Sequence, residues 1–185
     1  MRHSEVLIVP VLMLADYYLT IVGAKLAQSG YRAHFKSASY ELNPIWRGDV
    51  AKLRWFNPRH LLLAALLTAL LLFAAEASDT LDPWFFPVMF GMVLGAFTPI
   101  ITQHLGNILT FEFMRRNPNE VEGSVTFSMR YAIVASIAQG MTVLVVLALV
   151  AWLTQVPIAY GMLAGAGVLM LARFSWFARA KRGAR

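Results

Sequence analysis

The sequence predicts an all-α membrane protein, a polytopic bundle of five transmembrane helices. Three observations lead to this class. Hydrophobic residues make up 58% of the 185-residue chain and charged residues only 14%, against about 45–50% and about 25% in soluble domains. The apolar residues form blocks long enough to cross a bilayer, which takes roughly 20 residues. Loops rich in basic residues alternate with loops that lack them, as in multi-pass proteins.

The apolar blocks predict spans at residues 5–26, 59–75, 84–113, 131–153 and 157–174. The first block contains Asp16 and lacks a small-residue cleavage site, so we interpret it as a retained helix and not as a signal peptide. Pro157 suits the first position of the last helix, because the N–H that proline lacks has no partner there. Residues 1–185 then form a single transmembrane domain.

The charges of the loops orient the predicted bundle. Basic residues cluster at 25–59, at 115–130 and at 173–185, whereas the loop at 76–82 has three acids and no base. Basic loops stay in the cytoplasm. The sequence therefore predicts an outside amino terminus, a cytoplasmic carboxyl terminus and a place in the inner (plasma) membrane. The net charge of +6 then serves contact with anionic membrane lipids and not with nucleic acid.

A short amphipathic helix is predicted at residues 44–56, in the first cytoplasmic loop. Asn43 and Pro44 are a typical helix start. Trp46, Val50 and Leu53 follow at helical spacing on one face. Such a basic amphipathic helix lies in the membrane surface; the alternative is a loop helix that packs on the bundle.

Asp16 is the clearest functional candidate, because an ionisable group inside the membrane costs roughly 2.5–3.5 kcal/mol. Thr20 and Gly23 follow it at i+4 and i+7 and share its face, which should point into the bundle. Asp16 could be a proton or cation site, a metal ligand or a general base. It could also be a buried carboxylate that neighbouring side chains satisfy.

The third span carries a second polar stripe, formed by Gln103 and Asn107 with His104 beside them. His104 could be a ligand, a base or a proton carrier, or a satisfied structural histidine. Gly91 and Gly95 predict close helix contact, and the glycines of the last span predict a packing or dimer helix. Ser136, Gln139 and Thr142 of the fourth span are expected to form interhelical hydrogen bonds.

A third group of polar residues falls at the predicted cytoplasmic mouth. We expect Asp16, Glu41 and His104 to converge there as catalytic groups in a cavity open to the cytoplasmic leaflet. The binding residues predicted around them are Thr20, Asn43, His60, Gln103, Asn107, Glu112, Arg115 and Arg116. For Arg115 and Arg116 the alternative is that they extend into water.

Asp16, Thr20 and the run Glu41-Leu42-Asn43-Pro44 resemble a pattern in small bacterial polytopic membrane proteins. In those uncharacterised proteins, an aspartate in the first helix precedes a Glu-x-Asn-Pro element. The resemblance covers about the first sixty residues and names no activity. It implies that Asp16, Glu41, Asn43 and Pro44 belong to one site.

Three functions are consistent with this pattern. The first is a transporter or channel for an ion or small solute, which five spans per chain would favour as a homo-oligomer. The second is an enzyme acting on a lipid or lipid-linked substrate, and the third is a non-catalytic assembly partner. Transport is slightly favoured, because no complete catalytic set can be named. The chain has no cysteine, no metal motif, and no pattern that specifies a cofactor.

Overall fold

The computed structural model describes residues 3–37, 40–78, 80 and 82–182 and is 82% helical. Within these residues, five helices are long and apolar enough to cross a membrane. They are built on α1 (Ile8–Leu26), α4 (Pro58–Ser78), α5 (Phe85–Arg116), α6 (Met129–Thr154) and α7 (Pro157–Arg182). The predicted helical class with five spans is therefore confirmed, whereas the predicted orientation in the membrane stays a prediction.

The first and last spans are longer than predicted. The first extends through a π-helical turn (Ala27–Tyr31) and α2 (Arg32–His34), and the last continues to Arg182 in place of 174. A helix does not stop where its residues become polar, and basic side chains near a carboxyl end are favoured by the helix dipole. As a result, Arg173 lies well inside α7 and not at its end.

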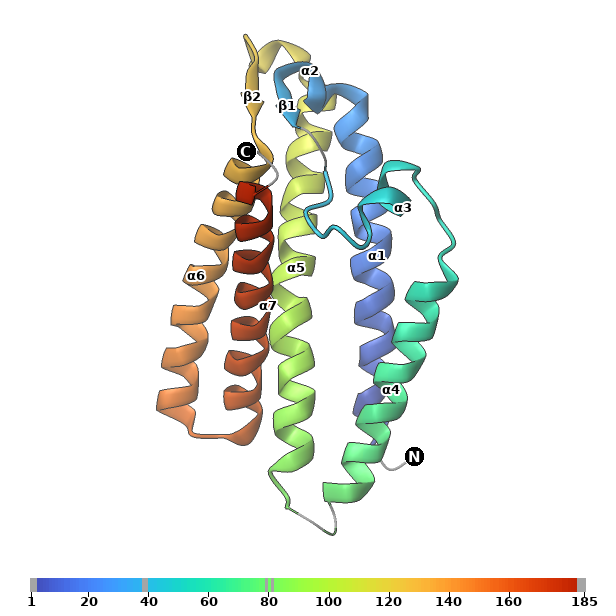
Figure 1. Cartoon of the computed structure of the whole chain (residues 1–185), viewed down its shortest axis with the longest axis vertical. Coiled ribbons are helices and arrows are strands. Elements are labelled where there is room, and N and C mark those ends of the chain that lie inside the picture. Colours follow the sequence, from blue (N-terminus) through green and yellow to red (C-terminus); the bar gives the residue numbers. More distant parts are fainter. Residues whose placement is uncertain (1–2, 38–39, 79, 81, 183–185) are drawn as a thin grey trace.

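Helix α5 is the centre of the bundle, with α1 and α4 on one side and α6 and α7 on the other (Figure 1). Gly91 and Gly95 of α5 lie against Gly161 and Gly165 of α7, so closely that an added Cβ at any of them would collide with the facing backbone. The predicted glycine contact is confirmed, and it fixes α5 and α7 rigidly in one half of the bundle.

The same half is closed by an apolar core. Val6, Val9 and Leu71 are completely buried, and they pack with Phe90 and Val93 of α5. These side chains come from the first span, α4 and α5, so they join three helices. Together with the glycine contact, they fill the centre of this half of the bundle with apolar side chains.

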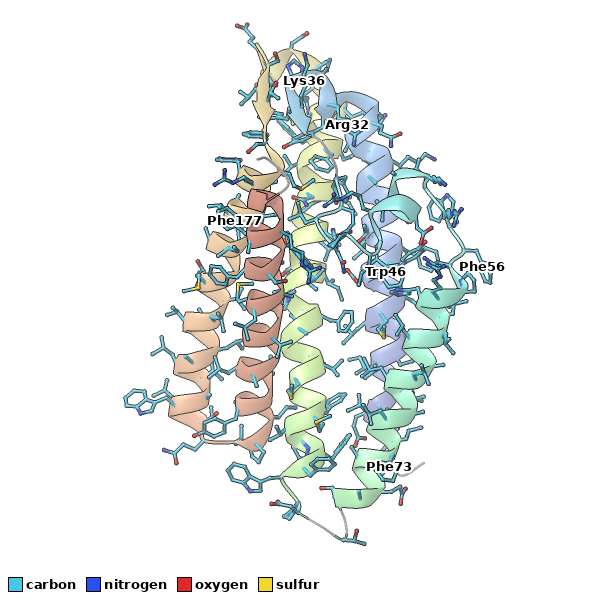
Figure 2. All side chains as sticks on the ribbon, in the orientation of Figure 1. Arg32, Lys36, Trp46, Phe56, Phe73 and Phe177 are labelled. Atoms are coloured by element: carbon cyan, nitrogen blue, oxygen red, sulfur yellow. The ribbon has the colours of Figure 1, made fainter. Side chains whose placement is uncertain are left out.

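The exterior of the bundle is apolar. Leu62, Phe73, Trp152, Leu153 and Leu171 each expose 60–73% of their surface. Phe73 lies on the lower part of α4 in Figure 2. Soluble monomers rarely expose contiguous apolar surface on this scale. The bundle fits an integral, multi-pass membrane protein.

The other half carries the long connections, among which two short strands depart from the all-helical prediction. β1 (Phe35–Ser37) and β2 (Val125–Phe127) pair in parallel, with Lys36 opposite Thr126. Aromatic rings reinforce this pairing: Phe35 stacks on Tyr31 at 4.7 Å, and Phe127 stacks on Tyr131 at 4.9 Å between ring centroids. The strand pair ties the end of the first span to the start of α6.

The helix predicted at 44–56 is α3 (Arg47–Ala51), which is much shorter. Leu53 has a positive φ of 49°, which ends the helix. Val50 is 2% exposed and packs on Tyr17 and Ile21 of α1, while Phe56 is 69% exposed. The alternative of a loop helix that packs on the bundle describes α3 better than a continuous amphipathic helix does.

One hydrogen bond joins this segment to α1, and two others join residues within the segment. The Tyr17 hydroxyl donates to the Arg54 carbonyl (2.6 Å), and Asp49 accepts from Arg54 Nη1 (2.8 Å) and Asn57 Nδ2 (2.9 Å). Arg32 and Lys36 lie at the end of the bundle that contains the strands (Figure 2). The basic connections thus gather at that end; which side of the membrane it faces stays a prediction.

Candidate functional site

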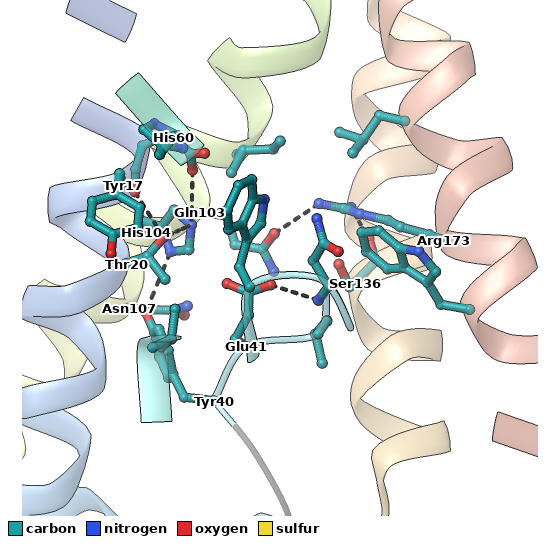
Figure 3. A pocket seen from close by; sticks show the side chains of 18 residues that line it. Tyr17, Thr20, Tyr40, Glu41, His60, Gln103, His104, Asn107, Ser136 and Arg173 are labelled. Atoms are coloured by element: carbon teal, nitrogen blue, oxygen red, sulfur yellow. Dashed lines mark hydrogen bonds and ion pairs between the residues drawn. The ribbon is translucent and has the colours of Figure 1, made fainter. Parts of the chain in front are cut away.

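The segment 40–46 folds back between the helices (Figure 1). It lines a cavity of about 140 Å³ (Figure 3). Six helices supply its walls together with this segment, namely α1, α3, α4, α5, α6 and α7. Eight of the eleven predicted site residues line it: Asp16, Thr20, Glu41, Asn43, His60, Gln103, His104 and Asn107. Non-helical backbone is tolerated inside a membrane bundle when it lines such a cavity.

Asp16 and His104 form the first feature of the site. His104 Nε2 lies 3.3 Å from Asp16 Oδ1 and 2.9 Å from Thr20 Oγ1. The Thr20 hydroxyl donates its only hydrogen to the Asp16 carbonyl (2.8 Å), so it must accept from His104. The Nε2 atom therefore carries a proton, and Nδ1 is the basic nitrogen of the neutral ring.

Tyr40 faces that basic nitrogen. Its hydroxyl lies 3.4 Å from His104 Nδ1, which is long for a hydrogen bond between O–H and N. Burial raises the pKa of Tyr40 to about 12, while a hydrogen bond with Asn107 acts in the opposite direction. Tyr40 thus remains a proton donor at neutral pH, and its weak contact with His104 can give way to a ligand.

Glu41 lies between the two sides of the cavity (Figure 3). The Asn43 backbone N–H donates to Glu41 Oε1 at 2.6 Å, and the Asn43 side chain accepts from the Ile45 N–H at 3.0 Å. Burial raises the pKa of Glu41, an effect that the hydrogen bond from Asn43 partly offsets. A carboxyl group with a raised pKa can act as a proton donor.

Arg173 is the main feature that the sequence analysis missed. It is only 5% exposed, and it donates from Nη1 to the Ser136 carbonyl (2.6 Å) and from Nη2 to Gln103 Oε1 (3.1 Å). None of the ion pairs among the described residues involves it. A buried guanidinium without a carboxylate partner costs free energy and offers its other N–H groups to an anion.

A signal for Arg173 exists in the sequence. Ala159, Ala166 and Met170 are buried on α7, and Arg173 follows Met170 by three positions and Ala166 by seven. Helical periodicity therefore places it on the buried face. The basic residues that follow it concealed this, because they made it look like the first residue of a polar tail.

Two polar atoms in the cavity wall have no hydrogen-bond partner among the described residues. They are Ser136 Oγ and His60 Nδ1, on side chains 2% and 5% exposed. His60 Nε2 donates to the Met13 carbonyl (2.9 Å), and the ring stacks on Tyr17 with centroids 4.7 Å apart. His60 is thus buried, not at an open mouth. Buried polar groups are normally satisfied, so these two favour a polar occupant.

Three predicted residues lie outside the cavity. Glu112 pairs with Arg115 Nη2 and with Arg116 Nε, both at 2.7 Å, near the end of α5. The face of α5 that contains His104 and Asn107 continues to Phe111 and Met114, which are buried. Glu112, Arg115 and Arg116 pair with one another and are not among the residues that line the cavity, so their role in binding stays a prediction.

The predicted interhelical contacts of α6 are found in part. Gln103 Nε2 donates to Gln139 Oε1 at 2.9 Å and links α5 to α6, as expected for Gln139. Ser136 Oγ forms no such bond within the described chain. No group of three histidine, aspartate or glutamate side chains that could hold a metal ion occurs among the described residues.

The fold and the site define a class: a multi-pass helical membrane protein with a polar cavity. A carboxylate–histidine pair lies on one side of the cavity, and an arginine that has no carboxylate partner among the described residues lies on the other. Comparisons with protein-family models, curated proteins and solved structures found no match to this chain. The function must therefore be argued from the chemistry of the cavity.

Proposed function

We propose that this protein is a membrane-embedded enzyme that transfers or hydrolyses a phosphate ester by acid–base chemistry. The single observation that carries the proposal is the arrangement across one cavity of the Asp16–His104 pair and of Arg173, which has no carboxylate partner among the described residues. A proton acceptor and an anion-binding group thus lie on opposite walls. We place this cavity on the cytoplasmic side of the inner (plasma) membrane, as the basic loops indicate.

The roles follow from the hydrogen-bonding pattern. Asp16 orients the imidazole, and His104 Nδ1 accepts the proton of an attacking water or hydroxyl group as its oxygen bonds to phosphorus. The bond from phosphorus to the leaving oxygen breaks as that oxygen takes the proton of Glu41. Arg173 holds the phosphate oxygens, for which a guanidinium is well suited. Proton transfer from His104 to Glu41 through water resets the site.

The packing of the bundle supports an enzyme more than a pathway. The half of the bundle beyond the cavity is occupied by the apolar core and by the glycine contact between α5 and α7. Continuous apolar packing there favours a closed reaction site over a path through the membrane. A pure assembly role is less favoured, because it gives no reason for the unpartnered Ser136 Oγ and His60 Nδ1. The resemblance implies that Asp16, Glu41, Asn43 and Pro44 belong to one site, and the presence of the first three on one cavity supports this; Pro44 is not among the lining residues.

A second candidate is proton-coupled transport of a small anion. It is favoured by the placement of the cavity between two helix pairs, α1 with α4 and α6 with α7, on opposite sides of α5 (Figure 1). A rocking movement of one helix pair against α5 would open the apolar half of the bundle to the cavity. This candidate would also favour a homo-oligomer, since five spans enclose little space.

The test uses the full chain reconstituted in vesicles that contain phosphatidylglycerol and a polyprenyl phosphate, with glycerol phosphate outside. Mass spectrometry follows the products. We expect turnover of a phosphate ester, which His104→Gln lowers by about 10²–10⁴-fold. His34→Gln is the matched control, because His34 contacts Gly123 outside the cavity. Absence of turnover, or equal rates in both variants, contradicts the enzyme; uptake of unchanged phosphate that Asp16→Asn abolishes supports the transporter.

A further inference from the structure

A second hollow, of about 400 Å³, lies between α5 and α6. Gly106, Gln139 and Val143 are among its lining residues, and Gln103, Asn107 and Arg173 line both this groove and the first cavity. The two hollows therefore meet at three polar side chains. We refer to the second hollow as the α5–α6 groove.

The groove is polar on a surface that is otherwise apolar. Thr102, Gly106, Thr110 and Gln139 are exposed there, between helices whose outer faces carry exposed side chains such as Leu105, Leu109 and Val146. The hydroxyls of Thr102 and Thr110 donate to carbonyls of their own helix, so Gln139 is the exposed polar group here that needs a reason, because polar groups that face hydrocarbon are costly. The Gln139 amide N–H groups donate no hydrogen bond within the described chain, although its Oε1 accepts from Gln103.

Arg173 gives the inner end of the groove a positive charge. It donates two hydrogen bonds, to the Ser136 carbonyl and to Gln103 Oε1, and its other N–H groups have no partner among the described residues. Gly140, which lines the groove, leaves the space that Arg173 Nη1 and Met170 occupy. A molecule in the groove could thus place an anionic group on the guanidinium while its remainder stays between the exposed apolar side chains.

We propose that the α5–α6 groove is the lateral entrance by which an anionic phospholipid brings its phosphate to Arg173. This proposal rests on the proposed function and names its substrate class as a lipid phosphate. The charge of Arg173, the polar side chains that line the groove and their exposure on the outer surface of the bundle all match such a headgroup. Inorganic phosphate shares the charge but not the acyl chains, so it would not need the groove.

Gly106 offers a variant that blocks the groove without disturbing the fold. A Cβ at Gly106 meets nothing within 4 Å, so Gly106→Leu places its side chain in the groove. Gly167 of α7 is equally unobstructed and lines neither hollow. Gly167→Leu is therefore the matched control for an added leucine on a spanning helix.

The experiment measures the binding of short-chain phosphatidic acid and of inorganic phosphate to the purified full chain in detergent, together with its oligomeric state. We expect Gly106→Leu to weaken phosphatidic acid binding by about tenfold or more and to spare phosphate binding, and Gly167→Leu to change neither. Arg173→Gln should weaken both.

The other outcomes separate this inference from the proposed function. If Arg173→Gln weakens binding but Gly106→Leu does not, the groove is not the entrance, and the site at Arg173 stands. If the wild type binds phosphate as tightly as phosphatidic acid, the substrate is soluble, and the lipid inference is overturned. If Gly106→Leu changes the oligomeric state in place of lipid binding, the groove is a contact between copies. If Arg173→Gln changes nothing, both proposals are wrong.

Discussion

The Tyr40 hydroxyl occupies the space that Gly23 leaves on α1, so a methyl group at position 23 would collide with it. We predict that Gly23→Ala displaces Tyr40 from His104 and returns the Tyr40 pKa from about 12 toward the ordinary value near 10. Tyrosinate absorbance near pH 10.5 should rise in Gly23→Ala relative to the wild type. The same substitution in a Tyr40→Phe background should leave it unchanged; an equal rise there would locate the effect in another tyrosine.

Glu41 should make stability depend on pH. Its folded-state pKa is raised above 4.5, mainly by burial, so its contribution is fully present below about pH 4.5 and is lost as the pH rises through the folded-state pKa. Glu41→Gln stays neutral throughout. The Tm of this variant minus that of the wild type should therefore increase from acidic to neutral pH. Glu122→Gln, at an exposed position, is the control, and a constant difference would contradict the prediction.

Asp16 and His104 should act as one unit. We predict that Asp16→Asn and His104→Gln each lower turnover by about 10²–10⁴-fold, and that the double variant loses little more than either single one. The amide that Asp16→Asn introduces retains an oxygen that can accept from His104 Nε2, so folding should be preserved. Independent, additive losses in the rate measurements would show that the 3.3 Å contact has no joint role.

We expect Arg173 to lower the thermal stability of the protein and to strengthen its binding of phosphate. Arg173→Met removes a buried charge that has no carboxylate partner among the described residues, and the Tm should stay equal or rise. Phosphate binding should weaken by about 10–100-fold, which corresponds to charge-assisted hydrogen bonds of about 1.5–3 kcal/mol. Thermal unfolding and binding are measured on the same preparation. A large fall in Tm would instead make Arg173 a structural link between α5, α6 and α7.

Two glycines of α5 should respond oppositely to leucine. Gly95 touches the backbone of α7 at Met162, whereas Gly106 faces open space. Gly95→Leu should separate the helices and abolish recovery of folded protein, while Gly106→Leu should unfold within a few degrees of the wild type. Size-exclusion profiles and unfolding curves test this; similar behaviour of the two variants would contradict the close α5–α7 contact.

Local patterns in the sequence predicted the spans and most of the cavity wall. Asp16 and Thr20 share one helical face, as do Gln103 and Asn107. The polar face of a membrane helix is expected to point into the bundle, because hydrocarbon cannot satisfy its hydrogen bonds. The positions of Tyr40 and Ser136 could not be predicted, because they depend on how separate helices meet. Glu112 was assigned to the site on its charge alone, whereas in the structure it pairs with Arg115 and Arg116.

The pairing of β1 with β2 has a consequence for how the protein is made. During synthesis, β1 and the segment with Tyr40 and Glu41 that follows it leave the ribosome before α4 and α5. The partner strand of β1, Val125–Phe127, emerges only after α5. Arg173 comes later still. The two walls of the cavity are therefore brought together only near the end of biogenesis, so a nascent chain interrupted after α5 would hold the carboxylates and the histidine without the cation that completes the site.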